Sequence, residues 1–396
     1  MDIRGFRLTA VPEDFTDDPY PYYAALRSRS PIHELDHASY FLSRYDDVVA
    51  VYRHGAASSD KKIEFKPKFG DSPLYEHHTT SLVFNDAPLH TRVRGLIIGA
   101  LNQRAIARME AGVSALVDSL LDRMEEKRTC DFISDFAARI PVEVIGNLLA
   151  IPKDERGPLR DWSIAILSGL EPRPTAEMLE RGNRAVVEFK DYLARLVEDR
   201  RRNPGDMDTD VLTRLSQDKA ITALELYHNC IFLLNAGHET TTNLIGNGLW
   251  LLLNHPAELA RLRSDVGLLP LAVEEMLRYE GPIQLNNRRL LEPLEVRGVR
   301  LAEGSLITLG IGAANRDPEQ FPDAERFDAG RKPNRHVAFG HGDHACAGMN
   351  VARMEARIAF ARLLKRFSTL EPAGTPERDR RIRFRGFRKL PVAVRV

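Results

Sequence analysis

Along most of the chain, apolar residues recur at the spacing of an α-helix. Residues 103–127 place an apolar side chain at every third or fourth position, at Ile106, Met109, Val113, Leu116 and Leu120. Residues 175–202 carry a stripe of the same kind, and such stripes predict amphipathic helices that pack against a core. The helical pattern extends over about residues 86–282 and 347–367, so helices dominate the prediction.

Strand patterns are shorter and fewer. Residues 32–45 and 294–310 contain short runs of β-branched or aromatic side chains. They are expected to form short paired strands, with turns near residues 36–39 and 302–304. Rossmann and barrel folds alternate strands and helices regularly, so the pattern argues against both. The chain is therefore predicted to be mainly α with minor β-sheets, an α+β protein.

No repeat, low-complexity tract or linker divides residues 1–396, which predicts a single large domain. Residues 55–85 and 312–342 show little periodicity and are expected to be irregular. Long irregular stretches in a compact domain are often functional.

Composition narrows the class of protein. Lys and Arg together number 56, as do Asp and Glu, so the chain lacks the basic excess typical of nucleic-acid binders. Its three cysteines, Cys130, Cys230 and Cys346, are too dispersed for a disulfide framework or a structural zinc site. The N-terminal segment lacks the apolar run of a signal peptide, and no 18-residue window predicts a membrane span. We expect a cytoplasmic protein.

The strongest chemical signal is the segment from Phe339 to Gly348, which reads FGHGDHACAG. Two glycines inside it permit a tight turn. A helix is expected to begin at Ala347, so Cys346 lies at its N-terminus, where free N–H groups and the helix dipole favour a thiolate. Gly348 leaves space for a flat group beside that helix. Such a thiolate is a candidate axial ligand for heme iron, and the alternative is a buried free cysteine beside a glycine-rich turn.

A second signal is a helix expected from about Thr222 to Asn254. Thr222 and Glu225 have the spacing of a capping box at its start, and the pair His255–Pro256 ends it. The helix is largely apolar and long enough to cross the whole molecule. It is therefore predicted to be central.

Polar residues lie in the middle of this helix, where they cost free energy unless they have partners or a task. Gly237 and Thr240 are three residues apart and share a face. Glycine weakens the helix locally, and a threonine hydroxyl can bond back to a carbonyl and open a groove. With the adjacent Glu239, this groove could bind a diatomic molecule and deliver protons to it. The alternative is a kink filled by a satisfied threonine.

Two further motifs carry charge. Glu275 and Arg278 have the spacing of a helical ion pair, which taken alone is most often a surface pair. His90 and Arg94 lie one turn apart and could together hold an anion such as a carboxylate, and Arg288 could supply another contact. Singly, each of these cations reads as a surface residue.

Together and in this order, the four signals resemble the cytochrome P450 superfamily over nearly the whole chain. The segment Phe339–Gly348 resembles its heme-binding loop, and Ala236–Thr241, which reads AGHETT, resembles its oxygen-activation motif. The Glu275–Arg278 pair matches its ExxR motif, with Arg326 matching the arginine that completes that triad. Asp86–Arg94 resembles its propionate-binding helix.

The resemblance implies a long central helix over heme b, with Cys346 as the thiolate ligand of the iron. It places Gly237 at the border of the dioxygen site and makes Glu239 and Thr240 an acid–alcohol pair that relays protons to dioxygen. The other cofactor-binding residues that it implies surround the heme: His90, Arg94, Arg288, Phe339, His344 and Gly348.

The implied function is that of a heme-thiolate monooxygenase, which inserts one oxygen atom from O2 into a small organic substrate. A monomer is expected to take electrons from a ferredoxin-type donor with its NAD(P)H-dependent reductase, because no flavin or nicotinamide domain is evident. Two alternatives are a peroxide-driven peroxygenase and a non-catalytic heme-binding or sensor protein. The Glu239–Thr240 pair argues against the first, and the lack of an evident output domain argues against the second.

The resemblance also locates the substrate pocket, among residues 60–85, 168–190, the central helix, 283–287 and 385–388. Several polar side chains in these segments point to a substrate with a polar or anionic handle: Asn235, Gln284, Asn286, Asn287 and Arg385. A basic docking face for an acidic ferredoxin is predicted from Arg331, Lys332, Arg335, Arg353 and Arg357.

Overall fold

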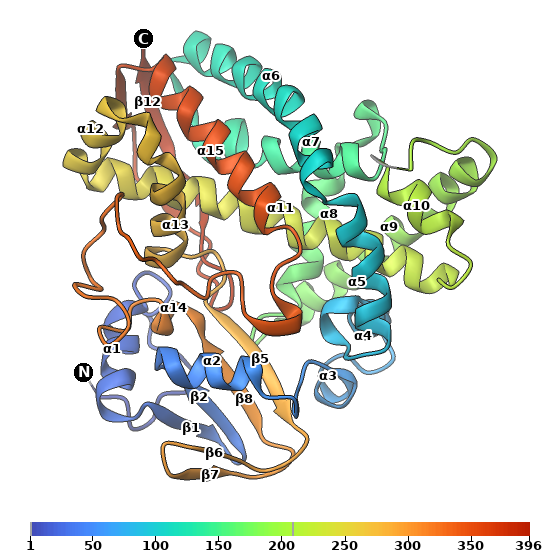
Figure 1. Cartoon of the computed structure of the whole chain (residues 1–396), viewed down its shortest axis with the longest axis vertical. Coiled ribbons are helices and arrows are strands. Elements are labelled where there is room, and N and C mark those ends of the chain that lie inside the picture. Colours follow the sequence, from blue (N-terminus) through green and yellow to red (C-terminus); the bar gives the residue numbers. More distant parts are fainter. Residues whose placement is uncertain (1, 208–209) are drawn as a thin grey trace.

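A central helix organises the fold of the computed structural model, which describes residues 2–207 and 210–396 (Figure 1). This helix, α11, spans Ala223–Asn254 without interruption and is about 48 Å long at 1.5 Å per residue. The Thr222 side chain accepts a hydrogen bond from the Glu225 backbone, and the Glu225 carboxylate accepts one from Thr222, so the predicted capping box is present. The helix ends at His255, as predicted.

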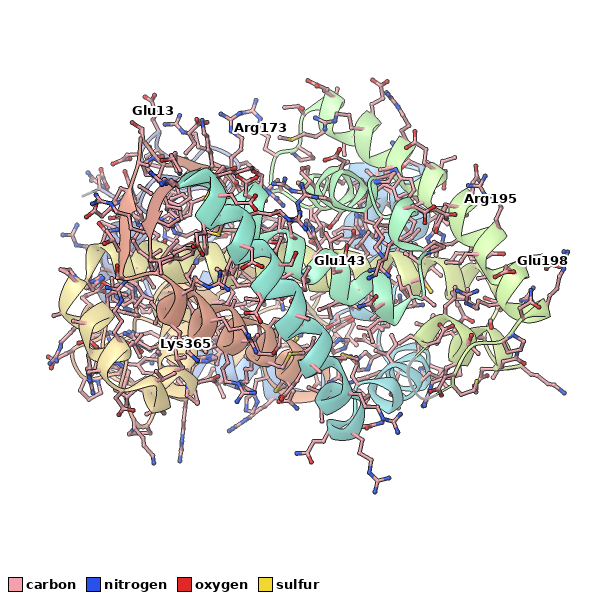
Figure 2. All side chains as sticks on the ribbon, turned by 90° about the horizontal axis from the view of Figure 1, so that it is seen from above. Glu13, Glu143, Arg173, Arg195, Glu198 and Lys365 are labelled. Atoms are coloured by element: carbon pink, nitrogen blue, oxygen red, sulfur yellow. The ribbon has the colours of Figure 1, made fainter. Side chains whose placement is uncertain are left out.

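Helices pack around α11 on several sides. In both views α6 (Gln103–Lys127) runs beside α15 (Met349–Arg366), and α15 in turn contacts α11 and α13 (Leu269–Tyr279) (Figures 1 and 2). Figure 2 also shows charged side chains of α9, including Arg195 and Glu198, reaching outward from the helical region. The remaining α-helices of the described residues are α1 (Tyr20–Arg29), α2 (Tyr45–Arg53), α3 (Lys62–Phe69), α4 (Pro73–Thr80), α5 (Leu89–Ala100), α7 (Arg139–Leu148), α8 (Leu159–Ser168), α9 (Ala176–Arg202), α10 (Val211–Gln217), α12 (Pro256–Ser264) and α14 (Ile311–Ala314).

The sheets are small. The largest has the order β1-β2-β8-β5-β3, with β2 and β8 parallel and the other pairs antiparallel. A second sheet has the order β4-β12-β9, and β6–β7 and β10–β11 form two-stranded ladders. The strands are β1 (Ile32–Asp36), β2 (Ser39–Leu42), β3 (Ala57–Ser58), β4 (Thr129–Asp131), β5 (Leu285–Leu290), β6 (Leu294–Val296), β7 (Val299–Leu301), β8 (Leu306–Gly310), β9 (Thr369–Pro372), β10 (Glu377–Arg378), β11 (Phe387–Lys389) and β12 (Pro391–Arg395).

The mainly α prediction with minor sheets is confirmed, and several predicted elements are found within two residues of their expected ends. The stripe of 103–127 buries Ile106, Val113 and Leu120, while Met109 and Leu116 stay partly exposed. The helix after the cysteine begins at Met349 rather than Ala347, because Gly348 takes the N-cap position.

Two predictions about local structure are wrong. Residues 55–85 are not irregular, because they form β3, α3 and α4; buried imidazoles of His77 and His78 occupy positions of α4 that an apolar pattern would mark. The segment 294–310 has an additional turn at Arg297–Gly298, where both residues have positive φ. Its last strand, β8, pairs with the distant β2 and with β5, which precedes the β6–β7 pair, instead of with its sequence neighbour β7.

The largest apolar core surrounds α11 and draws on helices from α3 to α15. A second cluster joins the N-terminal segment to the largest sheet, which lies at the lower left in Figure 1. In the described ranges no helix is both long and apolar enough to cross a membrane. The site described next lies where the helical core and the sheet end meet.

Candidate active site

The cysteine loop is closed by backbone contacts. Gly340 and Gly342 have φ of 69° and 71°, a left-handed conformation that favours glycine. The Cys346 N–H donates to the Phe339 carbonyl at 2.8 Å, which closes the loop. A Cβ on Gly342 would lie 2.9 Å from the Tyr52 carbonyl, so α2 presses directly on the turn. Backbone geometry thus fixes the sulfur at the end of the loop.

The Cys346 thiol experiences opposing influences. Burial raises its pKa, whereas a hydrogen bond from the Gly348 backbone and the charges of Arg94 and Arg353 lower it. A bound metal ion removes a thiol proton outright, so this sulfur fits a metal ligand. Arg353 also stacks over Phe339, with its guanidinium carbon 4.8 Å from the ring centroid. A Cβ built on Gly348 meets nothing within 4 Å, as expected for a residue that leaves room beside α15.

The predicted anion-binding residues come together beside this loop. The rings of His90 on α5 and His344 stack at 3.8 Å between centroids, and Arg94 donates to the Ala345 carbonyl at 2.6 Å. Arg288 reaches them from β5. The pKa of His344 is lowered to about 3, first by burial and then by the charge of Arg288. The residues thus converge from three separate segments.

This cluster fits an anionic cofactor. His90 is 4 % exposed, and its Nε2 has no hydrogen-bond partner. Burial, followed by the charge of Arg94, lowers its pKa. Buried cations and an orphaned ring nitrogen are stabilised by carboxylates placed among them. The propionate groups of heme carry that chemistry.

Part of the middle of α11 remains accessible, although most residues of the helix are buried. Ala236 is exposed and Thr240 is partly exposed, while their neighbours His238 and Glu239 are buried. The Thr240 hydroxyl donates to the Ala236 carbonyl at 2.7 Å, which is the predicted bond back to the preceding turn. Ala236 and Thr240 therefore lie on an accessible face of the motif.

Gly237 is packed closely on one side. A Cβ at this position would lie 2.6 Å from Cδ1 of Ile145 on α7. Its missing side chain thus permits close packing of α7 on α11. Gly237 is nevertheless partly exposed, as is Thr240.

Glu239 is held in a buried ion pair. Its side chain is paired with Arg381, which also donates to Glu171 at 3.2 Å. Burial raises the pKa of Glu239 to about 7, against the opposing charge of Arg381. Its Oε2 atom has no hydrogen-bond partner. A carboxyl that titrates near neutrality and adjoins a hydroxyl can pass protons.

The Glu275–Arg278 pair is fully buried, with both side chains 0 % exposed and 2.7 Å between Arg278 Nε and Glu275 Oε2. The prediction that Arg326 completes the triad is wrong. Arg326 contributes its carbonyl to Arg278, whereas the side chain that bonds Glu275, at 3.1 Å, is that of Arg331. Arg326 and Arg331 are only five residues apart in an irregular segment, where spacing does not determine which side chain turns inward.

The bond between Arg331 and Glu275 also keeps Arg331 out of the predicted docking face, because the Arg331 side chain is only 11 % exposed. Arg353 is engaged as well, with Glu274 at 2.7 Å. Lys332 and Arg335 are exposed, and Arg357 lies 3.6 Å from Glu110. A groove of about 490 Å³ runs between α6, α13 and α15 beside these last two residues.

The predicted polar pocket residues divide into two groups. Arg385 belongs to the core, because it bonds Glu280 at 2.7 Å and the carbonyls of Thr16 and Asp17. The other four are buried or partly buried, and orphaned oxygens remain on Asn235 and Gln284.

Sequence reasoning missed Lys68, Glu171, Arg381 and Arg383, which lie beside the Glu239 region. An available signal was the alternation of arginines at positions 381, 383 and 385. In an extended segment this alternation brings like charges onto one face.

Known proteins share this architecture. The cytochrome P450 family model matches residues 172–393. The biotin biosynthesis cytochrome P450 of Bacillus subtilis is 34 % identical over 385 residues, which cover 96 % of this chain and 97 % of that protein. The 6-deoxyerythronolide B hydroxylase of Saccharopolyspora erythraea is 34 % identical and covers 98 % of this chain and 100 % of its own length.

Solved structures of cytochromes P450 have the same fold as this chain. The structure of P450BioI with an acyl carrier protein ligated to hexadec-9Z-enoic acid has a TM-score of 0.92 at 32 % identity and covers 97 % of this chain and 100 % of its own. A myxobacterial cytochrome P450 in complex with myristic acid has a TM-score of 0.89 at 36 % identity, with 98 % and 100 % covered. With its cysteine loop, buried Glu–Arg pair and central helix, the chain belongs to the cytochrome P450 family of heme-thiolate monooxygenases.

Proposed function

We propose that Cys346 binds the iron of heme b as a thiolate and that His90, Arg94, Arg288 and His344 hold the heme propionates. The observation that carries this proposal is the convergence of a loop-fixed sulfur with a cluster of two arginines and two imidazoles. Phe339 and Gly348 flank the sulfur, one under Arg353 and the other open beside α15. Both fit a flat ring system at this place.

When bound, the heme supplies activation of dioxygen and insertion of one oxygen atom into a small organic substrate, while the second oxygen leaves as water. The protein orients the substrate and delivers protons. Thr240 holds a proton on Oγ1, where it now donates to the Ala236 carbonyl. Glu239 holds an exchangeable proton near neutral pH and can replenish that hydroxyl. Arg381 fixes the Glu239 carboxyl through their ion pair.

Electrons are proposed to come from a ferredoxin-type protein and its NAD(P)H-dependent reductase. The exposed cations Lys332 and Arg335 precede the cysteine loop, and Arg357 follows it on α15. A basic surface beside the sulfur would steer an acidic donor to it. Lys332→Glu and Arg335→Glu are expected to raise the KM for the ferredoxin and leave the Kd for substrate unchanged.

The spectrum of the reduced carbon monoxide complex tests the ligand assignment. Wild-type protein should show the long-wavelength Soret band of a thiolate-ligated heme, and Cys346→His should shift it to that of a histidine-ligated heme. Cys230→Ser is a matched control, because Cys230 is buried within α11, and it should keep the wild-type band. A histidine-type band in folded wild-type protein would refute the proposal.

Turnover tests the electron supply. Product should form with NADH or NADPH, reductase and ferredoxin, and should depend on O2. Product formed equally well with hydrogen peroxide alone would favour a peroxygenase instead.

A further inference from the structure

Two cations, Lys68 on α3 and Arg383 in the segment between β10 and β11, lie close together with only neutral partners. Lys68 Nζ donates to the Glu171 carbonyl at 2.6 Å, and Arg383 Nε donates to the adjacent Leu170 carbonyl at 3.1 Å. Burial and then the charge of Arg383 lower the pKa of Lys68 to about 8. Neighbouring cations that are partly buried repel each other, so an anion between them is stabilising.

The nearby carboxylates are already engaged. Glu171 accepts from Arg381 and from the backbone N–H groups of Ile382 and Arg383. Glu64 pairs with the buried Lys61 at 2.6 Å. In the part of the chain that the structure describes, no carboxylate forms a salt bridge with either Lys68 or Arg383. The charges of Glu171 and Glu64 raise the pKa of both cations, but neither carboxylate forms an ion pair with Lys68 or Arg383.

Both cations retain hydrogen-bond donors. Arg383 uses one N–H on each guanidinium nitrogen, toward Leu170, Leu285 and Asn287. A guanidinium has five N–H groups, so two remain, one on each terminal nitrogen. Lys68 uses one of three, so two remain there as well. A carboxylate has two oxygens that accept four such bonds.

Hydrogen bonds connect the region of Lys68 and Arg383 to the residues that we propose act in catalysis. Arg383 bonds to β5, the strand that also carries Arg288 into the heme-binding cluster. Two residues before it, Arg381 bridges Glu171 and Glu239 of α11. An anion held by Lys68 and Arg383 would thus be connected to Glu239 through Glu171 and Arg381. Aromatic rings of α3 adjoin it, since Lys68 Nζ is 5.2 Å from the Phe69 ring centroid.

We propose that the substrate is an organic carboxylic acid with an apolar body, and that Lys68 and Arg383 bind its carboxylate. The proposal rests on the monooxygenase function above and names its substrate class. Because Lys68 and Arg383 hold the substrate by its carboxylate, a carbon of its apolar body remote from the carboxylate is presented to the accessible face of Ala236 and Thr240.

The test uses probes that bind the heme iron whatever the natural substrate is. These are ω-(imidazol-1-yl)alkanoic acids of 8, 10 and 12 carbons, their methyl esters and the matching 1-alkylimidazoles. The imidazole ligates the iron and produces a red-shifted Soret band, which gives the Kd, while the chain carries or lacks a carboxylate. For at least one length, the acid should bind about tenfold or more tightly than both neutral probes.

Variants assign that preference to the two side chains. Lys68→Met and Arg383→Gln should each reduce it severalfold, and Lys68→Arg should retain it. Lys66→Met is the matched control on the same helix, because Lys66 is 49 % exposed, and Arg388→Gln is the control beyond Arg383, at 77 % exposed. Both controls should bind all probes as wild-type protein does.

The outcomes separate the two proposals. If the folded protein lacks the thiolate-type Soret band of the reduced carbon monoxide complex, the heme assignment fails whatever the probes do. Equal affinity for acids and neutral probes at every length in wild-type protein overturns the substrate class, and this comparison needs no variant to fold. Tighter binding of the methyl esters also overturns it and favours a substrate without a free carboxylate, such as an acyl thioester. An acid preference that survives both variants overturns the assignment to Lys68 and Arg383.

Discussion

Replacing Glu275 with glutamine is expected to destabilise the fold rather than the chemistry. The Glu275 carboxylate accepts five hydrogen bonds while 0 % exposed. Two come from Arg278, at 2.7 and 2.8 Å, and the others from Arg331 Nε, the Asp328 backbone and the Asn334 amide, at 3.0 to 3.1 Å. This carboxylate therefore joins α13 to the segment before the cysteine loop.

Glutamine keeps the shape but replaces one accepting oxygen with an NH2 group, which meets donors. It also leaves the Arg278 charge buried without its counter-ion. Removing one partner of such a pair costs about 3–5 kcal/mol. A large domain loses roughly 2 °C of Tm per kcal/mol, so Glu275→Gln should lower the Tm by about 6–10 °C.

The assay is thermal unfolding of the heme-loaded protein followed by far-ultraviolet circular dichroism at one heating rate. Glu180→Gln is the matched control, since Glu180 and Arg184 also form an ion pair within one helix but are 74 % and 62 % exposed. Exposed helical pairs contribute about 0.5 kcal/mol or less, so its Tm should move by about 1 °C. A Glu275→Gln protein with unchanged Tm and heme content that has lost only turnover would refute the structural role.

Three further changes probe the site. Thr240→Ala removes one hydrogen bond, worth about 1 kcal/mol, so folding and substrate Kd should persist while product per nicotinamide oxidised falls severalfold and hydrogen peroxide rises. Product per nicotinamide should also fall as pH rises through about 7, where Glu239 loses its proton; Arg381→Met removes the charge that lowers this pKa and should move the fall to higher pH. Gly342→Ala forces a side chain into φ of 71° and toward a carbonyl at 2.9 Å, so heme content should drop, whereas Gly298→Ala should retain it.

Each of these three predictions has an outcome that would contradict it. Thr240→Ser keeps the hydroxyl and should keep the coupling; equal loss in both variants would point to packing instead. A pH profile that is flat, or that Arg381→Met moves to lower pH, would remove Glu239 from proton delivery. Full heme retention in Gly342→Ala would show that the loop adapts.

The sequence predicts well those features that depend on local pattern. Helices with regular apolar stripes, the capping box at Thr222 and the glycines of the cysteine loop are all found where expected. Each follows from residues within a few positions of one another, and short-range periodicity or backbone preference determines it. Four of the predicted cofactor-binding side chains also gather as expected, although that grouping came from the family resemblance.

Features that depend on distant contacts were not predicted. The triad uses Arg331 instead of Arg326, and Gly237 permits Ile145 of α7 to pack closely on α11. In both cases only the partner from another segment decides what the residue contacts. The helix α4 was also not predicted, because His77 and His78 occupy buried positions where the helical pattern expects apolar residues.

The arginines at 381, 383 and 385 show how surroundings, and not residue type, assign function. Burial disfavours the charge of each. The carboxylate of Glu239 offsets that cost for Arg381, and that of Glu280 offsets it for Arg385, so the pKa of both is raised. Arg383 meets only carbonyl and amide oxygens, and burial lowers its pKa. Two of the three charges are thus balanced inside the protein. Glu171 and Glu64 act on the third without an ion pair, and burial still lowers its pKa, so a bound anion would offset the remaining cost of burying its charge.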